Sequence, residues 1–164
     1  MPAQIQPAVV GATGYAGFEL ARLLYRHPGM KKPVLFTREG EGAAPVRLDE
    51  VYPHIAGNGG FPLEPFNFVK LKDKGVDLLF LATPHEVSRE WVPELMRHGV
   101  RVVDLSGAWR LLQRDSRAVY QFHDADPELA DQITTQAVYG IPELHRAKLK
   151  SSTLVANDGC YATS

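Results

Sequence analysis

The sequence contains a single cysteine, no excess of either charge and no long apolar run. Cys160 is the only cysteine among 164 residues, so an internal disulfide is excluded and a reducing compartment is favoured. The 18 basic and 19 acidic side chains give a net charge of -1, which offers no electrostatic basis for binding nucleic acid or an anionic membrane. No apolar run approaches the ~20 residues of a membrane span, and the N-terminus lacks the basic and apolar regions of a signal peptide. We therefore predict a cytoplasmic protein with no nucleic-acid or membrane partner.

Short apolar runs alternate with helix-like stretches along the chain. Predicted strands cover residues 5–10, 33–37, 67–70, 76–83, 100–106 and 152–157. Helices are predicted over 15–26 and 86–98, the first with an apolar side made of Phe18, Leu20, Leu23 and Leu24. The segment 38–65 is rich in glycine and proline and is predicted mainly as loop, and 107–125 is predicted as a long polar connection. This order predicts one α/β domain over residues 1–164, a Rossmann-like, doubly wound and mostly parallel sheet whose ligands bind beyond the carboxyl ends of the strands.

The segment "GATGYAG" follows the first predicted strand and opens the first predicted helix. Its glycines, Gly11, Gly14 and Gly17, have the spacing G-x-x-G-x-x-G. In a dinucleotide site the first glycine permits a tight turn, the second lets the backbone approach a pyrophosphate, and the third lets the helix pack closely on the strand. The alternative is a glycine-rich turn without a ligand. The position of the motif between a strand and a helix favours dinucleotide binding.

The end of the second predicted strand bears on the choice of cofactor. NAD sites usually carry an acidic residue about 20 positions after the glycines, which binds the ribose 2′-hydroxyl. Thr37 and Arg38 lie there instead, and a hydroxyl beside a guanidinium suits the 2′-phosphate of NADP. Glu39 follows directly, and an exposed loop arginine is the alternative interpretation. The pair favours NADP over NAD, and no metal site is predicted.

Cys160 follows the last predicted strand and Gly159, at the expected start of a helix. A lone cysteine is often an inert core residue. A helix N-terminus, however, favours the thiolate, and a thiol beside a nicotinamide can hold an acyl group as a thioester while hydride reaches the carbonyl carbon. Both interpretations remain open from the residues alone.

Five segments in this order resemble one enzyme family. They are "VGATGYAG", "LATPHEVS", "VVDLSGAWRL", "VYGIPEL" and "VANDGCYAT", and together they run from about residue 5 to residue 164. The sequence is similar to N-acetyl-γ-glutamyl-phosphate reductase of arginine biosynthesis, and the chain matches the N-terminal NADP-binding half of that enzyme, ending just after the catalytic cysteine. Aspartate-semialdehyde dehydrogenases and a reductase acting on a protected aminoadipyl phosphate share the scheme and are the related alternatives.

The resemblance implies a role for each matching residue. Cys160 matches the nucleophile that forms the acyl-enzyme thioester, and Arg110 matches an arginine associated with the phosphate or carboxylate of the small-molecule acyl-phosphate substrate. The remaining matches concern the cofactor NADP: the phosphate loop of Gly11, Thr13, Gly14, Tyr15 and Gly17, the 2′-phosphate site of Thr37 and Arg38, and the loop of Thr83 and Pro84.

Two departures from the family pattern affect the expected activity. The family motif around the cysteine is Asn-Pro-Gly-Cys-Tyr-Pro-Thr, and this sequence has Asp158 and Ala162 at the proline positions, which loosens the turn and places a negative charge near the thiol. Members are also roughly twice as long. Their second domain, absent from this chain, supplies a catalytic histidine and the interface of a homo-oligomer. We therefore expect NADP binding with little or no reductase activity from these 164 residues alone, and a dinucleotide-binding module without catalysis is the alternative function.

Overall fold

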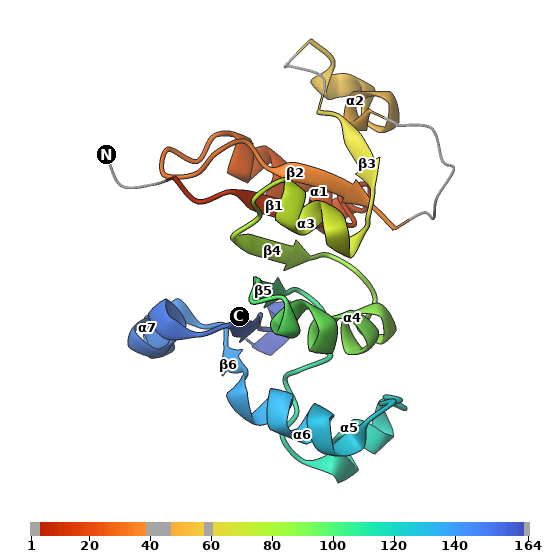
Figure 1. Cartoon of the computed structure of the whole chain (residues 1–164), viewed down its shortest axis with the longest axis vertical. Coiled ribbons are helices and arrows are strands. Elements are labelled where there is room, and N and C mark those ends of the chain that lie inside the picture. The colour runs from red at the N-terminus through yellow and green to blue at the C-terminus, as the bar shows by residue number, and fades with distance from the viewer. Residues whose placement is uncertain (1–3, 39–46, 58–60, 163–164) are drawn as a thin grey trace. The chain divides into compact units, whose positions relative to one another are not determined.

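The computed structural model describes residues 4–38, 47–57 and 61–162, and the chain divides into two compact units, Met1–Ala82 and Thr83–Ser164. Figure 1 shows the elements of both units in chain order. Parts of the predicted glycine-rich loop, residues 39–46 with Glu39 and residues 58–60, lie outside the described residues.

The first unit is a parallel sheet of four strands with helices in the connections (Figure 1). Its strands lie in the order β3-β2-β1-β4, and Val9 is aligned with Leu35 on one side and Phe80 on the other. The strands are β1 (Pro7–Val10), β2 (Val34–Thr37), β3 (Leu63–Pro65) and β4 (Leu78–Leu81). The helices are α1 (Tyr15–Tyr25), α2 (Leu48–Val51), the 3-10 turn η1 (Pro53–Ile55) and α3 (Phe68–Asp73).

The core of the first unit lies between its sheet and α1. Val9 and Ala21 are fully buried, and Phe18 and Leu24 of α1 pack into the same cluster. Burial of an aliphatic or aromatic side chain of this size stabilises a fold by about 1.5–3 kcal/mol. The predicted apolar side of α1 is wrong at Leu23, which is 69% exposed, because Ala21 and Leu24 are the residues that turn toward the sheet.

The second unit contains a parallel sheet of three strands in the order β5-β7-β6. Asp104 at the end of β5 is aligned with Ala156 at the end of β7, so the loops that follow these strands leave the same edge of the sheet. The strands are β5 (Arg101–Asp104), β6 (Val138–Tyr139) and β7 (Leu154–Ala156). The helices are α4 (His85–Arg97), α5 (Arg114–Val119), α6 (Pro127–Gln136), α7 (Pro142–Ser151) and the 3-10 turn η2 (Cys160–Ala162).

Three predicted elements differ from the structure. Residues 67–70 begin α3 rather than forming a strand, because the Asn67 side chain accepts a hydrogen bond from the Val69 amide at 2.8 Å and caps the helix. The strand of that region is β3, directly before the cap. The polar connection 107–125 contains α5, and α6 follows it without having been predicted. The last helix is only the three-residue turn η2.

The prediction of a Rossmann-like, mostly parallel α/β fold is confirmed by the strand pairings, because the strands β1 to β4 and the strands β5 to β7 pair in parallel within their units. The helices α1 and α4 follow the predicted ranges within one residue at each end. In the described ranges, no helix has the length and apolar character that crossing a membrane requires.

Candidate functional site

The glycine loop after β1 turns sharply at Gly11. This residue has φ of +83°, and an added Cβ would lie 2.3 Å from the carbonyl oxygen of Ala82. The Gly11 amide donates to the carbonyl of Phe36 on β2 at 3.1 Å, which fixes the start of the loop. A Cβ on Gly17 would lie 2.2 Å from the Gly11 carbonyl oxygen, so α1 packs directly on the turn. The first and third glycines are therefore required by the fold itself.

Gly14 differs from both, because no close neighbour requires a glycine there. Its added Cβ would meet only the Gly11 carbonyl oxygen at 3.5 Å, an ordinary contact, and its φ of −81° suits any residue. Gly14 is exposed and is the N-cap of α1, and no side chain caps this helix. The N-terminal amides of an 11-residue helix without a side-chain cap can hold an anion. The loop thus has the open backbone surface that a pyrophosphate requires.

The other predicted residues of the first unit lie beside this loop and at the end of β2. Thr13 and Tyr15 are exposed, and Tyr15 has 86% of its surface accessible. The Thr13 carbonyl accepts a hydrogen bond of 2.8 Å from the hydroxyl of Tyr52, a residue that the sequence prediction did not include. Thr37 is half-buried at the end of β2 and Arg38 is exposed just after it. Because β1 and β2 are parallel neighbours, both sets of residues lie at one edge of the sheet.

Thr83 and Pro84 lie at the start of the second unit, where the chain enters α4. Pro84 is the exposed N-cap of α4, and this helix has no side-chain cap. Thr83 is 9% exposed, and its Oγ1 is buried without a hydrogen-bond partner among the described residues. A buried hydroxyl without a partner costs free energy, so packing alone does not explain why position 83 carries a hydroxyl.

The loop after β5 is shaped by a buried carboxylate. Asp104 is fully buried and accepts hydrogen bonds from the Ser106 amide at 3.1 Å and from the Ser106 hydroxyl at 2.8 Å. Desolvation raises the pKa of Asp104, and the hydrogen bonds from Ser106 partly offset this shift. Ser106 Oγ in turn accepts from the Ala108 amide at 3.1 Å. The sequence prediction missed Asp104, although an aspartate two positions before a serine at a strand end is a signal of such a turn.

Trp109 anchors the same loop in the interior of the second unit. It is 2% exposed, and its indole nitrogen donates to Ser88 Oγ on α4 at 2.9 Å. The guanidinium carbon of Arg89 lies 4.4 Å from the centre of the Trp109 ring, and Arg89 also pairs with Asp124 at 3.0 Å. A cavity of about 380 Å³ adjoins these residues, but the nitrogens of Arg89 are enclosed by protein atoms. Nε, Nη1 and Nη2 of Arg89 have no hydrogen-bond partner among the described residues, and the Asp124 ion pair and the Trp109 ring are contacts that hold this buried cation.

Arg110 follows Trp109 and reaches the loop that precedes the cysteine. Its Nε donates to the carbonyl of Asn157 at 2.6 Å, and its Nη2 donates to the carbonyls of Leu105 at 3.1 Å and Asp158 at 3.4 Å. An added Cβ on Gly159 would lie 3.2 Å from Nη1 of Arg110. The structure thus brings Arg110 and the cysteine loop together, and the pairing of β5 with β7 is what places their loops side by side.

Cys160 is exposed and is the first residue of η2. The loop before it is held by backbone bonds, since the Asn157 amide donates to the Asp104 carbonyl at 2.9 Å. A Cβ on Gly140 would lie 2.9 Å from the Cα of Asn157, so the glycine of "VYGIPEL" lets β6 approach this loop. The expected helix N-terminus at the thiol is reduced to a single 3-10 turn. The chemical roles of Cys160 and Arg110 stay predictions.

Three comparisons place this chain among known proteins. Residues 6–152 match the family model described as "Semialdehyde dehydrogenase, NAD binding domain". Proteins named N-acetyl-gamma-glutamyl-phosphate reductase from Magnetococcus marinus and Syntrophobacter fumaroxidans are 40% and 39% identical over 160 residues, which is 98% of this chain and 44% of each relative. The crystal structure of aspartate semialdehyde dehydrogenase II from Vibrio cholerae, complexed with ASA, has a TM-score of 0.61 and 20% identity over 97% of this chain and 43% of that one.

The curated relatives confirm the predicted resemblance, and the solved structure supports the fold alone. The chain spans less than half the length of these relatives. A nicotinamide dinucleotide is supported as the cofactor by the family model and by the reductase names. Because the model of the NAD-binding domain matches residues 6–152, this chain belongs to the semialdehyde dehydrogenase family.

Proposed function

We propose that this chain is the NADP-binding portion of an NADPH-dependent N-acetyl-γ-glutamyl-phosphate reductase, which reduces an acyl phosphate to a semialdehyde in arginine biosynthesis. The observation that carries the proposal is Gly14, the glycine for which the fold supplies no steric reason, at the uncapped N-terminus of α1. A backbone surface kept open at a helix N-terminus suits the pyrophosphate of a dinucleotide. The names of the curated relatives support the choice of reaction.

The residues that would hold the cofactor are those predicted from the sequence. The Tyr15 amide at the N-terminus of α1 would bind the pyrophosphate, and Gly14 would leave room for that group to approach. The Gly14 amide itself donates to the Gly11 carbonyl at 3.1 Å, so it maintains the turn together with Gly11 and Gly17. Thr83 has a buried hydroxyl that lacks a partner, which favours a position along the cofactor loop together with Pro84. When bound, NADPH supplies the hydride that reduces the acyl group.

Arg38 would distinguish NADPH from NADH, because its exposed guanidinium follows β2 directly and can pair with a 2′-phosphate. Arg38→Ala should weaken NADPH binding by at least about tenfold, the loss expected from one charge-assisted hydrogen bond, and leave NADH binding nearly unchanged. The matched control is Arg26→Ala, which removes an exposed arginine at the C-terminal end of α1, the end away from the glycine loop. Isothermal titration with both nucleotides is the measurement, and equal losses for NADPH and NADH in Arg38→Ala would remove the 2′-phosphate assignment.

Cys160 would act as the nucleophile of the reductase. Its thiolate would attack the carbonyl carbon of the γ-acyl phosphate, a carbon–sulfur bond would form, and the bond from that carbon to the phosphate oxygen would break with release of phosphate. Exposure of Cys160 gives a substrate access to the thiol. The anion role of Arg110, homo-oligomer formation by the longer enzyme and the lack of activity of these 164 residues alone rest on the resemblance and stay predictions. The cytoplasmic location, which rests on the composition, stays a prediction too.

A further inference from the structure

We propose that Arg110 is a positioning residue for Cys160 and acts through the backbone of the loop that precedes the cysteine. The proposal rests on the proposed function of Cys160 as a nucleophile. It adds to the anion role that the resemblance gives Arg110, because it concerns contacts that the arginine makes with the protein itself.

The guanidinium of Arg110 joins the loops that follow two neighbouring strands. Nε and Nη2 donate to Asn157 and Asp158 in the loop after β7, and Nη2 also donates to Leu105 in the loop after β5. The carbonyls of Asn157 and Asp158 lie three and two positions before the thiol, and that of Leu105 lies five positions before the arginine. One half-buried cation therefore fixes the direction of three peptide groups, two of which lead directly into Cys160.

Nε and Nη2 form the edge of an arginine that usually binds a carboxylate or phosphate through two parallel bonds. In this chain that edge faces the carbonyls of Asn157 and Asp158. A role limited to capturing an anion from solution would leave this edge open, so the observed contacts favour a role in holding the loop.

Gly159 gives an independent sign of the same contact. A Cβ there would lie 3.2 Å from Nη1 of Arg110, which is tighter than nine in ten real contacts of a Cβ, and the φ of Gly159 is not in the left-handed region. A larger residue beside the cysteine would therefore have to push the guanidinium away by a few tenths of an ångström.

The support of Arg110 is itself rigid. Asp104 and Ser106 fix the turn before it, and Trp109 is buried and hydrogen-bonded to Ser88 on α4. A functional side chain is positioned well when the residues behind it are held by packing and hydrogen bonds. A displacement of about 1 Å at a reacting group can reduce a rate by about 100-fold, so such support matters for a nucleophile on a loop.

The chain offers a matched control in Arg101, at the opposite end of β5. Its side chain donates to three backbone carbonyls as well, those of Ser152 at 3.1 Å and of Leu149 and Lys150 at 3.3 Å. Arg101→Ala removes the same kind of contact from the same strand pair, but away from the cysteine loop. Both variants lose an arginine that binds backbone carbonyls, so a difference between Arg110→Ala and Arg101→Ala reports the place of the lost contact.

The experiment measures amide hydrogen exchange in residues 157–161 and the rate of iodoacetamide alkylation of Cys160, the only thiol, from pH 6 to 9. We expect Arg110→Ala to raise exchange in this segment and to slow alkylation severalfold at pH 7, with partial recovery on adding millimolar guanidinium chloride but not sodium chloride. Arg101→Ala should leave both quantities at the wild-type values. If Arg110→Ala does not fold, Arg110→Lys serves instead, because lysine keeps the charge but lacks the rigid planar fork that reaches carbonyls of two loops at once.

The outcomes separate this inference from the function on which it rests. Wild-type exchange and wild-type alkylation in a folded Arg110 variant would overturn the positioning role. Equal effects of the Arg110 and Arg101 variants on residues 157–161 would overturn it too, because the contact would then have only a general structural effect. Alkylation of wild-type Cys160 at the rate and with the pH profile of N-acetylcysteine would instead remove the nucleophile assignment, while the exchange data would still decide whether Arg110 holds the loop.

Discussion

The three glycines of the loop after β1 share one motif but have different surroundings. Another residue at position 11 would be strained by the positive φ and would clash with the carbonyl of Ala82. A side chain at position 17 would clash with the carbonyl of Gly11. Gly14 has open space around its α-carbon. The motif therefore combines two glycines that build the turn with one that leaves it accessible.

This distinction predicts the stability of alanine variants. Gly11→Ala should lose roughly 3 kcal/mol of unfolding free energy, because a left-handed backbone and a clash with a backbone oxygen each cost about 1–3 kcal/mol. Gly17→Ala should lose a similar amount through its clash alone. Gly14→Ala should lose about 1 kcal/mol or less, the cost of alanine at an N-cap. Urea denaturation of the three variants measures the order, and equal losses at all three positions would contradict it.

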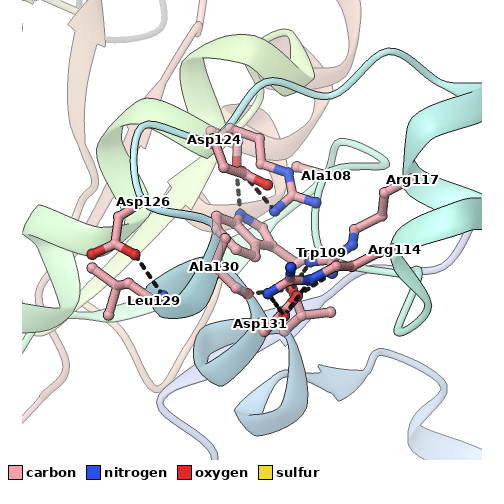
Figure 2. A network of polar contacts seen from close by, with 12 residues as sticks. Ala108, Trp109, Arg114, Arg117, Asp124, Asp126, Leu129, Ala130 and Asp131 are labelled. Atoms are coloured by element: carbon pink, nitrogen blue, oxygen red, sulfur yellow. Dashed lines mark hydrogen bonds and ion pairs between the residues drawn. The ribbon is translucent and has the colours of Figure 1, made fainter.

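At the scale of the element, charged side chains join α5 to α6. Arg114 and Arg117 of α5 both bind the carboxylate of Asp131 on α6, as Figure 2 shows, with Arg114 Nε donating to Asp131 at 2.6 Å. Arg117 is buried and also donates to Thr134 Oγ1 at 3.3 Å. The two arginines lower the pKa of Asp131 to about 2 from its usual 3.8.

The lowered pKa gives the sign of a pH effect on stability. Because the carboxylate is favoured in the folded state, Asp131 stabilises the fold above its unfolded pKa of 3.8, and this contribution is lost as the pH falls toward 2. Asp131→Asn should therefore be less stable than wild type at pH 7, and the difference should shrink between pH 3.8 and pH 2. The control is Asp115→Asn, an exposed aspartate of α5. Thermal melts across this range test the expectation, and a difference that does not change with pH would refute it.

The elements also show which features a single sequence can predict. The strands β1, β4 and β5 and the helices α1 and α4 follow from apolar runs and helical spacing, because the core selects those residues. The helix α3 was missed because its start depends on one side-chain cap at Asn67. The helix α5 was missed because its ion pairs to a distant aspartate leave no local apolar period. The helix α6 does have an apolar side at Ala130 and Ile133 and an Asp126 cap, a signal that the prediction did not use.

The candidate site was predictable to a similar degree. Gly11, Gly17 and Cys160 stand out because glycine spacing and a lone thiol are visible in the sequence. The contact of Arg110 with the cysteine loop was not predicted, because it involves the carbonyls of residues 157 and 158 and a backbone oxygen can be supplied by any residue. Tyr52 was missed for the same reason, since its partner is the carbonyl of Thr13.

At the scale of the whole molecule, the sequence distributes its candidate functions over two units. The first unit carries the glycine loop and the Thr37–Arg38 pair, and the second carries Arg110 and Cys160. In each unit these groups lie at the carboxyl edge of a parallel sheet, the edge where α/β proteins bind ligands. The chain spans less than half the length of its curated relatives. Dinucleotide binding is therefore the part of the proposed function that can be tested with these 164 residues alone.

The most direct test of the proposed function is a titration of the purified chain with NADPH, followed by nicotinamide fluorescence, in wild type and in Gly14→Ala. We predict saturable binding of one NADPH per chain, and a large loss of that binding in Gly14→Ala while its circular dichroism and unfolding free energy stay close to wild type. Tight binding that survives Gly14→Ala would remove the glycine loop as the pyrophosphate site. The absence of NADPH and NADH binding by the folded wild-type chain would contradict the proposed function.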